Sequence, residues 1–202
     1  MMKQLAVLTA VALASATACF AEAVVGEAAP AFTLTDTNGK DHNLGDFKGK
    51  YIVLEWINHD CPFVKKHYES GNMQKHQKAA AEKGVVWLSI NSSAPGKQGN
   101  YPAEKWNEMT AEKGGAATAV LLDESGAAGK AYGAKTTPHM FVINPEGVVI
   151  YAGAIDDKRG TDPEEIASAK NLVDAALAEA MAGQPVSVPS SQPYGCGVKY
   201  AD

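Results

Sequence analysis

The sequence predicts an α/β fold built around a parallel β-α-β unit. An apolar run at residues 51–57 is typical of a buried strand, and a polar segment compatible with a helix follows it from Cys61. A second apolar, β-branched run at 85–90 indicates the next strand. Two parallel strands need a crossover connection, which is usually a helix. Together these features place Cys61 at the turn from strand to helix.

The first 23 residues have the pattern of a secretory signal peptide. Lys3 precedes an apolar, alanine-rich segment at 5–18, and residues 21–23 form an A-x-A cleavage site. The segment is too short to span a membrane, so we expect an exported protein, periplasmic or secreted. The alternative is a lipoprotein with a lipid on Cys19, although Ala16 stands where such signals have a large aliphatic residue.

Cleavage after residue 23 leaves 202 − 23 = 179 residues, which suits one domain with a sizeable core. We expect this domain at 24–183, followed by an extended C-terminal arm at 184–202, which carries no helix signal. The formal charge of −5 and the single arginine argue against nucleic-acid binding. No later run is long and apolar enough to predict a stable membrane span.

The remaining elements follow from local patterns. A β-hairpin precedes the central unit, because alternating residues at 31–36 meet an Asn-Gly turn and a return strand at 41–44. The helix after Cys61 is expected to run to Gly84, which would cap it. Beyond it the sequence predicts a loop at 91–100, a helix at 102–113, a strand at 118–122, a short helix at 126–132, strands at 139–143 and 148–154, and a long helix at 163–181 capped by Asp162.

Cys61 is the strongest candidate for a reactive group. Proline is favoured at the first position of a helix, so Pro62 makes Cys61 the N-cap or its neighbour. The positive end of the helix dipole lowers the pKa of a thiol at that position, and Lys65 and Lys66 would add to the effect. The alternative is a buried structural cysteine that happens to precede a proline.

Three motifs carry a resemblance to a known family. They are Cys61-Pro62 at the strand-to-helix turn, Thr-Thr-Pro at 136–138 before a strand, and the hairpin at 141–147. With this order of elements, the chain resembles the thioredoxin-like superfamily, and its redoxin (AhpC/TSA-type) branch in particular, over about residues 31–182. The resemblance implies a thioredoxin-like fold with an N-terminal β-hairpin and an extended C-terminal arm.

The resemblance also implies a substrate-binding edge beside the cysteine. In this family the peptide bond before the proline is cis, so Pro138 would lie against the active cysteine. The backbone of Thr137 would then pair with an incoming peptide or disulfide. Asn58, His59 and Pro62, which flank the cysteine in the sequence, are the other substrate-binding candidates.

Glu55 lies six residues before Cys61, where thioredoxins place a buried acid that accepts a proton during exchange. A carboxylate buried beneath a thiol has a raised pKa and can act as a general base. The resemblance therefore implies a catalytic role for Glu55. The alternative is that Glu55 points outward at a solvated strand edge.

Two departures limit what the resemblance implies. Thioredoxins have a second cysteine three residues after the first, where this chain has Val64. Peroxiredoxins have a threonine three residues before the cysteine, a proline four further back and an arginine near the site. Here the first two positions hold Asn58 and Leu54, and the sole arginine, Arg159, is distant in sequence. We therefore expect a thiol-disulfide oxidoreductase, with a peroxiredoxin-like thiol peroxidase as the alternative.

Cys196 is the only other thiol that remains after the predicted export. Any mixed disulfide or sulfenic acid at Cys61 needs a second thiol to resolve it. We expect the arm to fold back so that Cys196 resolves Cys61, within one protomer or across a dimer, with Tyr194 and Tyr200 as anchors. The alternatives are that Cys196 pairs with nothing or with a separate protein.

A metal-binding or non-catalytic module is the third hypothesis. His59, His67 and His139 would gather near Cys61 if Pro138 lies against it, and cysteine with two histidines is an acceptable site for copper or zinc. Each histidine can equally be a solvated turn residue or a group that stabilises the thiolate. We expect no metal and no cofactor, and we expect the partners to be protein or small-molecule thiols and disulfides.

Overall fold

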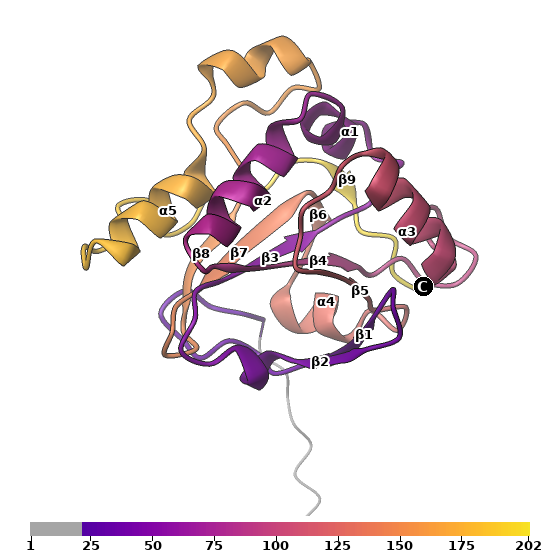
Figure 1. The fold of residues 1–202 in the computed structure, drawn as a ribbon, viewed down its shortest axis with the longest axis horizontal. Coiled ribbons are helices and arrows are strands. Elements are labelled where there is room, and N and C mark those ends of the chain that lie inside the picture. Colours follow the sequence, from indigo (N-terminus) through magenta and orange to yellow (C-terminus); the bar gives the residue numbers. More distant parts are fainter. Residues whose placement is uncertain (1–21) are drawn as a thin grey trace, which may run out of the picture.

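A seven-stranded mixed sheet forms the centre of the molecule (Figure 1). The structure, a computed structural model, describes residues 22–202. The sheet has the order β2-β1-β5-β4-β3-β7-β8; β3, β4 and β5 are parallel, and the other neighbours are antiparallel. Its strands are β1 (Thr33–Asp36), β2 (Asp41–Asn43), β3 (Ile52–Trp56), β4 (Val86–Asn91), β5 (Ala119–Leu122), β7 (His139–Ile143) and β8 (Val149–Gly153). The predicted parallel β-α-β unit, β3 to β4, is confirmed.

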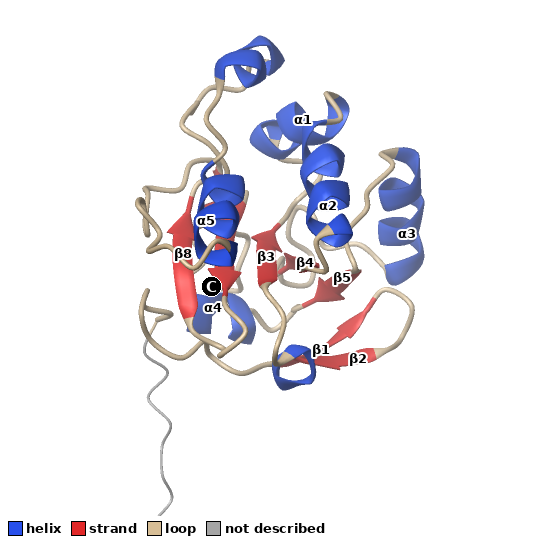
Figure 2. Ribbon diagram, turned by 60° about the vertical axis from the view of Figure 1, so that its left-hand side comes forward, coloured by secondary structure: helices blue, strands red, loops and turns tan. Residues whose placement is uncertain are grey.

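Helices cover both faces of this sheet. The helices are α1 (Pro62–Glu69), α2 (Asn72–Glu82), α3 (Ala103–Glu112), α4 (Ala127–Tyr132) and α5 (Leu172–Met181), with short 3-10 helices η1 (Leu44–Phe47) and η2 (Pro163–Ser168). Figure 2 shows α5, α2 and α3 side by side on one face and α4 on the other. A separate two-stranded ladder joins β6 (Thr136–Thr137) to β9 (Cys196–Gly197).

The two-sided cover explains the continuous apolar run of β3. Successive side chains of a strand point to opposite faces, so Val53 packs under α1, α2 and α5, whereas Leu54 and Trp56 pack towards α4. All three are fully buried. A parallel strand covered on both faces shows no polar alternation, and burying each such side chain stabilises the fold by about 2 kcal/mol.

Two predicted helices are interrupted, and each interruption has an identifiable cause. The helix after Cys61 does not run to Gly84, because Gly71 takes a left-handed φ of 75° and separates α1 from α2. The predicted helix at 163–181 is also wrong, because the chain leaves the helical conformation between Ser168 and Leu172. Asp162 caps η2 as expected, but the chain then extends, since the backbone of Lys170 bonds to Asp157 and Asn171 caps a new helix, α5.

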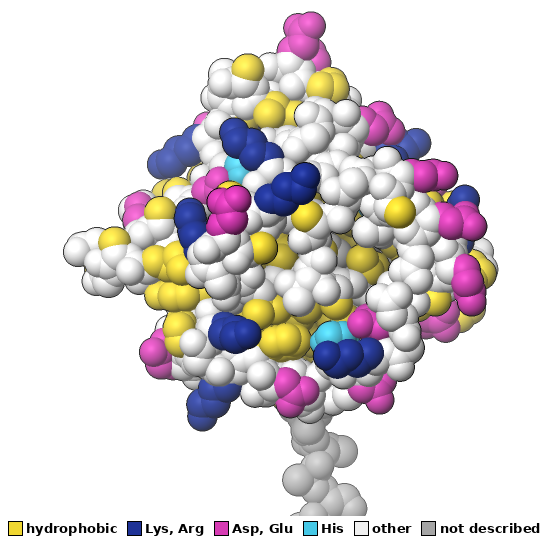
Figure 3. All heavy atoms as spheres, in the orientation of Figure 1, with side chains coloured by type: hydrophobic (Ala, Val, Ile, Leu, Met, Phe, Trp, Pro, Cys, Tyr) yellow, Lys and Arg dark blue, Asp and Glu magenta, His cyan; other side chains and the backbone are white. Residues whose placement is uncertain are grey.

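Parts of the sequence prediction fall outside the described residues. The predicted leader, 1–23, lies almost wholly there, as does Cys19. Between residues 22 and 202 no helix is both long and apolar enough to cross a bilayer. On the face drawn in Figure 3, acidic and basic side chains are interspersed and no single sign dominates, in keeping with the modest charge of −5.

Candidate functional site

Cys61 stands at the point where β3 gives way to α1. It is the N-cap of α1, with extended backbone angles, and Pro62 occupies the first helical position. The Cys61 N–H donates to the carbonyl of Asn58 at 3.0 Å, and the Cys61 carbonyl accepts the first helical hydrogen bond, from Lys65, at 2.9 Å. The predicted strand-to-helix placement is confirmed. Only 1% of the Cys61 surface is exposed.

The segment 136–138 lies directly against this thiol. The Thr137–Pro138 peptide bond is cis, as the resemblance implied. The Cys61 Sγ donates to the Thr137 carbonyl oxygen at a distance of 3.0 Å. Thr137 and Cys61, which are 76 positions apart in the sequence, are therefore in direct contact.

The C-terminal arm returns to the same place and pairs with it. In the β6–β9 ladder Cys196 is opposite Thr137 and Gly197 is opposite Thr136. Gly195 has a φ of 140°, and an added Cβ would collide with the Thr137 backbone carbonyl. Residues 196 and 197 of the arm are thus paired as a short strand, and the closeness of the arm to Thr137 requires glycine at position 195.

Two tyrosines fix the arm on either side of Cys196, and both expected anchors are confirmed. The Tyr194 hydroxyl donates to Asp156 at 2.6 Å, and the Tyr200 hydroxyl donates to the Ala134 carbonyl at 2.8 Å. The Tyr194 hydroxyl thus ties the arm to the segment after β8, and the Tyr200 hydroxyl ties it to the segment after α4. Cys196 is consequently held from both directions.

The surroundings of the two thiols shift their pKa values in opposite directions. Burial raises the pKa of Cys61, but hydrogen bonds from the side chain of Cys196 and from the backbone N–H groups of Cys196 and Val64 lower it, and the net shift is downward. Its pKa therefore lies below the ordinary value of 9.0. Burial, and then the neighbouring Cys61, raise the pKa of Cys196. Of the two thiols, Cys61 therefore has the larger thiolate fraction.

Neither Lys65 nor Lys66 is among the groups that chiefly set the Cys61 pKa. Lys66 is buried, and its Nζ donates to the carbonyls of Lys158 and Gly160 and to the carboxylate of Glu165, at 2.8 to 3.1 Å. Lys65 points to solvent. The helix end itself does contribute, through the Val64 N–H. Arg159 is exposed on the loop between β8 and η2.

Glu55 is fully buried, which excludes the outward orientation. Its carboxylate accepts hydrogen bonds of 2.8 to 3.2 Å from four side chains: Tyr68, Gln77, Trp87 and Ser89. Burial raises its pKa, although these donors act in the opposite direction. In the described part of the chain, none of its hydrogen bonds reaches Cys61 or Cys196. The sequence gave no indication of these four partners, which come from α1, α2 and β4.

Asn58 and His59 shape the turn before the cysteine. The Asn58 side chain accepts from the Asp60 N–H at 3.0 Å and donates to the Gln98 carbonyl at 3.3 Å, which ties the turn to the loop at 91–100. His59 is buried with its ring against Tyr68 and Trp106, and burial lowers its pKa to about 4. Neither side chain is brought into hydrogen bonding with a sulfur.

The ligand set needed for a metal site does not converge. His67 bonds to Tyr194 and Asn72, and the Nδ1 atom of His139 accepts from the backbone of Lys135. Across residues 22–202 no three histidine, cysteine, aspartate or glutamate side chains lie close enough to hold an ion. His67 and His139 thus make structural hydrogen bonds instead.

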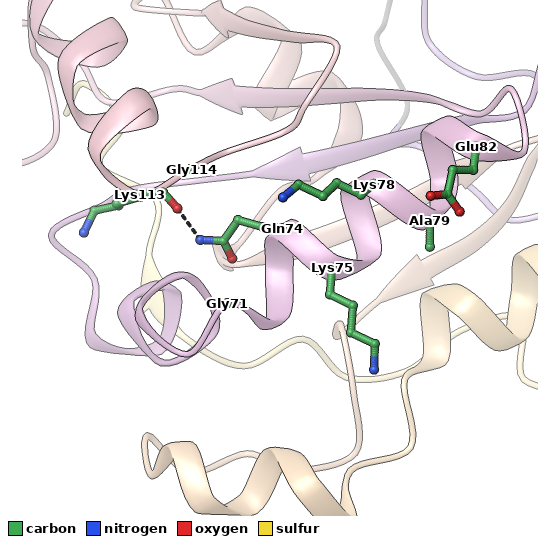
Figure 4. A pocket seen from close by; sticks show the side chains of 8 residues that line it. All are labelled: Gly71, Gln74, Lys75, Lys78, Ala79, Glu82, Lys113 and Gly114. Atoms are coloured by element: carbon green, nitrogen blue, oxygen red, sulfur yellow. Dashed lines mark hydrogen bonds between the residues drawn. The ribbon is translucent and has the colours of Figure 1, made fainter.

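One surface hollow lies away from the thiols. It measures about 640 Å³ and is lined mainly by α2 and the segment after α3, with Lys75, Lys78 and Lys113 around it (Figure 4). Gln74 donates across it to the Lys113 carbonyl. Neither cysteine lines this hollow, so it does not form part of the thiol site.

The chain is similar to several known proteins. The model of the Redoxin family matches residues 24–173. The thiol-disulfide oxidoreductase ResA of Bacillus subtilis (strain 168) is 34% identical over 126 residues, which cover 62% of this chain and 64% of ResA. The chain thus spans slightly less than two thirds of that relative's length.

Solved structures support the fold. An uncharacterized conserved protein from Geobacillus kaustophilus superposes with a TM-score of 0.74 at 28% identity, covering 88% of this chain and 93% of that one. A hypothetical protein from Sinorhizobium meliloti 1021 gives a TM-score of 0.72 at 26% identity, covering 90% and 97%. The α/β, thioredoxin-like fold expected from the motifs is confirmed.

Proposed function

Because the chain belongs to the Redoxin family, we propose that it is a thiol-disulfide oxidoreductase with Cys61 and Cys196 as its redox pair. One observation carries this proposal: the β6–β9 ladder places Cys196 opposite Thr137, whose carbonyl accepts from the Cys61 thiol. A second thiol therefore lies beside the N-cap cysteine, although Val64 occupies the position of the usual partner. The ResA relative is named for the same chemistry.

The proposed cycle transfers two electrons. The Cys61 thiolate attacks a substrate disulfide, forms a mixed disulfide and releases one substrate thiolate. The Cys196 thiolate then attacks the Cys61 sulfur, which releases the second substrate thiolate and leaves a Cys61–Cys196 disulfide. The substrate disulfide is reduced to two thiols and the enzyme dithiol is oxidised. A donor thiol pair must reduce it again, so the partners are protein or small-molecule thiols and disulfides.

The other predicted site residues have supporting roles in this proposal. Thr137 and Pro138 form the edge beside the sulfur, and Pro62 starts the helix whose N–H groups favour the thiolate. Asn58 and His59 hold the turn that precedes Cys61. Glu55 is proposed as the buried acid that takes up a proton during exchange. Its raised pKa suits this role, and any transfer to the thiols must pass through another group.

Exchange is favoured over peroxide cleavage by the charges near Cys61. A peroxidase needs a cationic partner for the thiolate, whereas Arg159 is exposed and Lys66 is engaged with Glu165. We further propose export to the periplasm or exterior, with a leader at 1–23, a redoxin domain at 24–183 and the arm at 184–202 completing its site. The mass of the protein purified from an expressing cell tests whether the leader is removed. A mass that still includes residues 1–23 would contradict this proposal.

Non-reducing peptide mapping after diamide treatment tests the redox pair. The expected product is a peptide pair linked through Cys61 and Cys196, formed at a rate independent of protein concentration if it is intramolecular. Cys196→Ser should then stop at a mixed disulfide on Cys61 and lose turnover in an insulin-reduction assay. The proposal is wrong if no such linked peptide forms and Cys196→Ser reduces insulin at the wild-type rate.

A further inference from the structure

A buried chain of hydrogen bonds lies beneath the arm, and the proposed cycle does not use it. Tyr194 is only 6% exposed, and its hydroxyl lies 2.6 Å from an Asp156 carboxylate oxygen and 3.2 Å from the His67 Nε2 atom. On the far side of the ring, the His67 Nδ1 atom lies 2.9 Å from the Asn72 side-chain nitrogen. Four side chains from α1, α2, the segment after β8 and the arm are thus connected.

The direction of these hydrogen bonds can be assigned from the partners. The Asn72 amide donates, so His67 Nδ1 accepts and the proton of the neutral ring sits on Nε2. Burial lowers the pKa of His67 to about 3, which keeps the ring neutral. The Nε2–H then donates to the Tyr194 oxygen, and the Tyr194 hydroxyl donates to Asp156. Donors aligned in one direction towards a carboxylate strengthen one another.

The Tyr194 ring also joins the arm to the helix that carries Cys61. Its centroid lies 5.9 Å from the ring centroid of Phe63, two residues after Cys61. The Lys66 ammonium lies 5.9 Å from the same centroid. Tyr194 itself is two residues before Cys196. The anchor therefore lies close in the chain to both thiols and links the two segments that carry them.

We propose that Tyr194, held by His67 and Asp156, is a positioning residue that fixes Cys196 over Cys61 and so sets how strongly the two thiols pair as a disulfide. This inference rests on the proposed function. In the relevant equilibrium, one oxidised glutathione takes two electrons from the dithiol, yielding two reduced glutathiones and the Cys61–Cys196 disulfide. Fixing the arm raises the effective concentration of Cys196 at Cys61 and shifts this equilibrium towards the disulfide.

The test compares Tyr194→Phe with a matched variant in glutathione redox buffers. Tyr194→Phe keeps the ring but leaves Asp156 and His67 without their shared partner. Its equilibrium constant for disulfide formation should fall about tenfold, the size expected for loss of a charged hydrogen bond. Tyr132→Phe removes another buried hydroxyl, which donates to the Pro30 carbonyl at 2.9 Å on the other face of the sheet, and should keep the wild-type constant.

Each outcome is decisive. An equal constant for Tyr194→Phe and wild type, or an equal fall in Tyr132→Phe, overturns the positioning role. If Tyr194→Phe fails to fold, Asp156→Asn decides, since it weakens the same anchor while retaining its shape: a lowered constant supports the role and an unchanged one overturns it. If wild-type protein forms no Cys61–Cys196 disulfide in any buffer, the proposed function itself is wrong, which is a distinguishable result.

Discussion

Replacing Gly195 by alanine is expected to release the arm from Cys61. At a φ of 140° an alanine is strained, which costs about 1–2 kcal/mol by analogy with other left-handed positions. Its Cβ would also strike the Thr137 carbonyl, a backbone atom that cannot swing aside, and such overpacking costs about 1–3 kcal/mol. Together the two effects should destabilise the docked conformation of the arm by about 2–5 kcal/mol.

Alkylation of Cys61 measures this release. Wild-type Cys61 is almost fully covered, so its reaction with iodoacetamide should follow the fraction of time that the arm is undocked. A loss of about 2 kcal/mol should raise the rate roughly 30-fold. Both proteins should carry Cys196→Ser so that only one thiol reacts.

Gly197→Ala is the matched control, because it lies in the same strand. A Cβ at position 197 would come no closer than 3.9 Å to the Lys135 carbonyl, which is an ordinary contact. Its alkylation rate should therefore stay near that of the parent. Equal alkylation rates of Cys61 in Gly195→Ala and Gly197→Ala would refute this reasoning. They would show that the clash at position 195 does not release the arm.

Three further predictions follow from the same geometry. In Cys196→Ala the midpoint of the alkylation rate of Cys61 against pH should move upward, because the change removes the Sγ of Cys196, which donates one of the hydrogen bonds that lower the Cys61 pKa; an unchanged midpoint would contradict this. Glu55 has a raised pKa in the folded state, so its neutral form stabilises the fold below its ordinary pKa of 4.5 and this contribution is lost as the pH rises. Urea unfolding of Glu55→Gln should therefore show a weaker loss of stability from pH 4 to 8 than wild type, and parallel curves would count against it. Tyr200→Phe removes the hydroxyl that donates to the Ala134 carbonyl, so docking of the arm should weaken by about 1 kcal/mol. Cys61 should then be alkylated roughly fivefold faster than in wild type. A wild-type alkylation rate would show that this hydrogen bond does not hold the arm.

Local patterns predicted most of the fold, because each depends on residues close in sequence. The Cys61-Pro62 N-cap, the β-hairpin and the parallel β3–β4 pair follow from strand periodicity and from helix-start chemistry. The two broken helices were not predictable in this way. The break before α5 depends on a contact between Lys170 and Asp157, and helix propensity carries no information about such a tertiary bond.

The chemistry of the site was predictable only in part. The sequence named Cys61, Thr137 and Cys196, since a cysteine, a Thr-Pro pair and a lone remaining thiol are recognisable as residue types. It did not predict that the Lys66 ammonium binds the Lys158 and Gly160 carbonyls and Glu165, because position in sequence does not show where the end of a long side chain lies. The partners of Glu55 and Tyr194 were missed for the same reason: they come from separate elements that only the folded chain brings together.

The pairing of the arm with residues near the cis proline also orders events during biosynthesis. Cys61 is made 135 residues before Cys196, and the β6–β9 ladder is a contact of long sequence separation, which forms late in folding. Until that ladder forms, the newly made domain presents a lone, uncovered thiol at a helix start. If the chain is exported to an oxidising compartment, as proposed, such a thiol would be open to pairing with thiols of other chains. In that case, formation of the β6–β9 ladder would end the period in which Cys61 is exposed to such pairing, in addition to bringing Cys196 to the site.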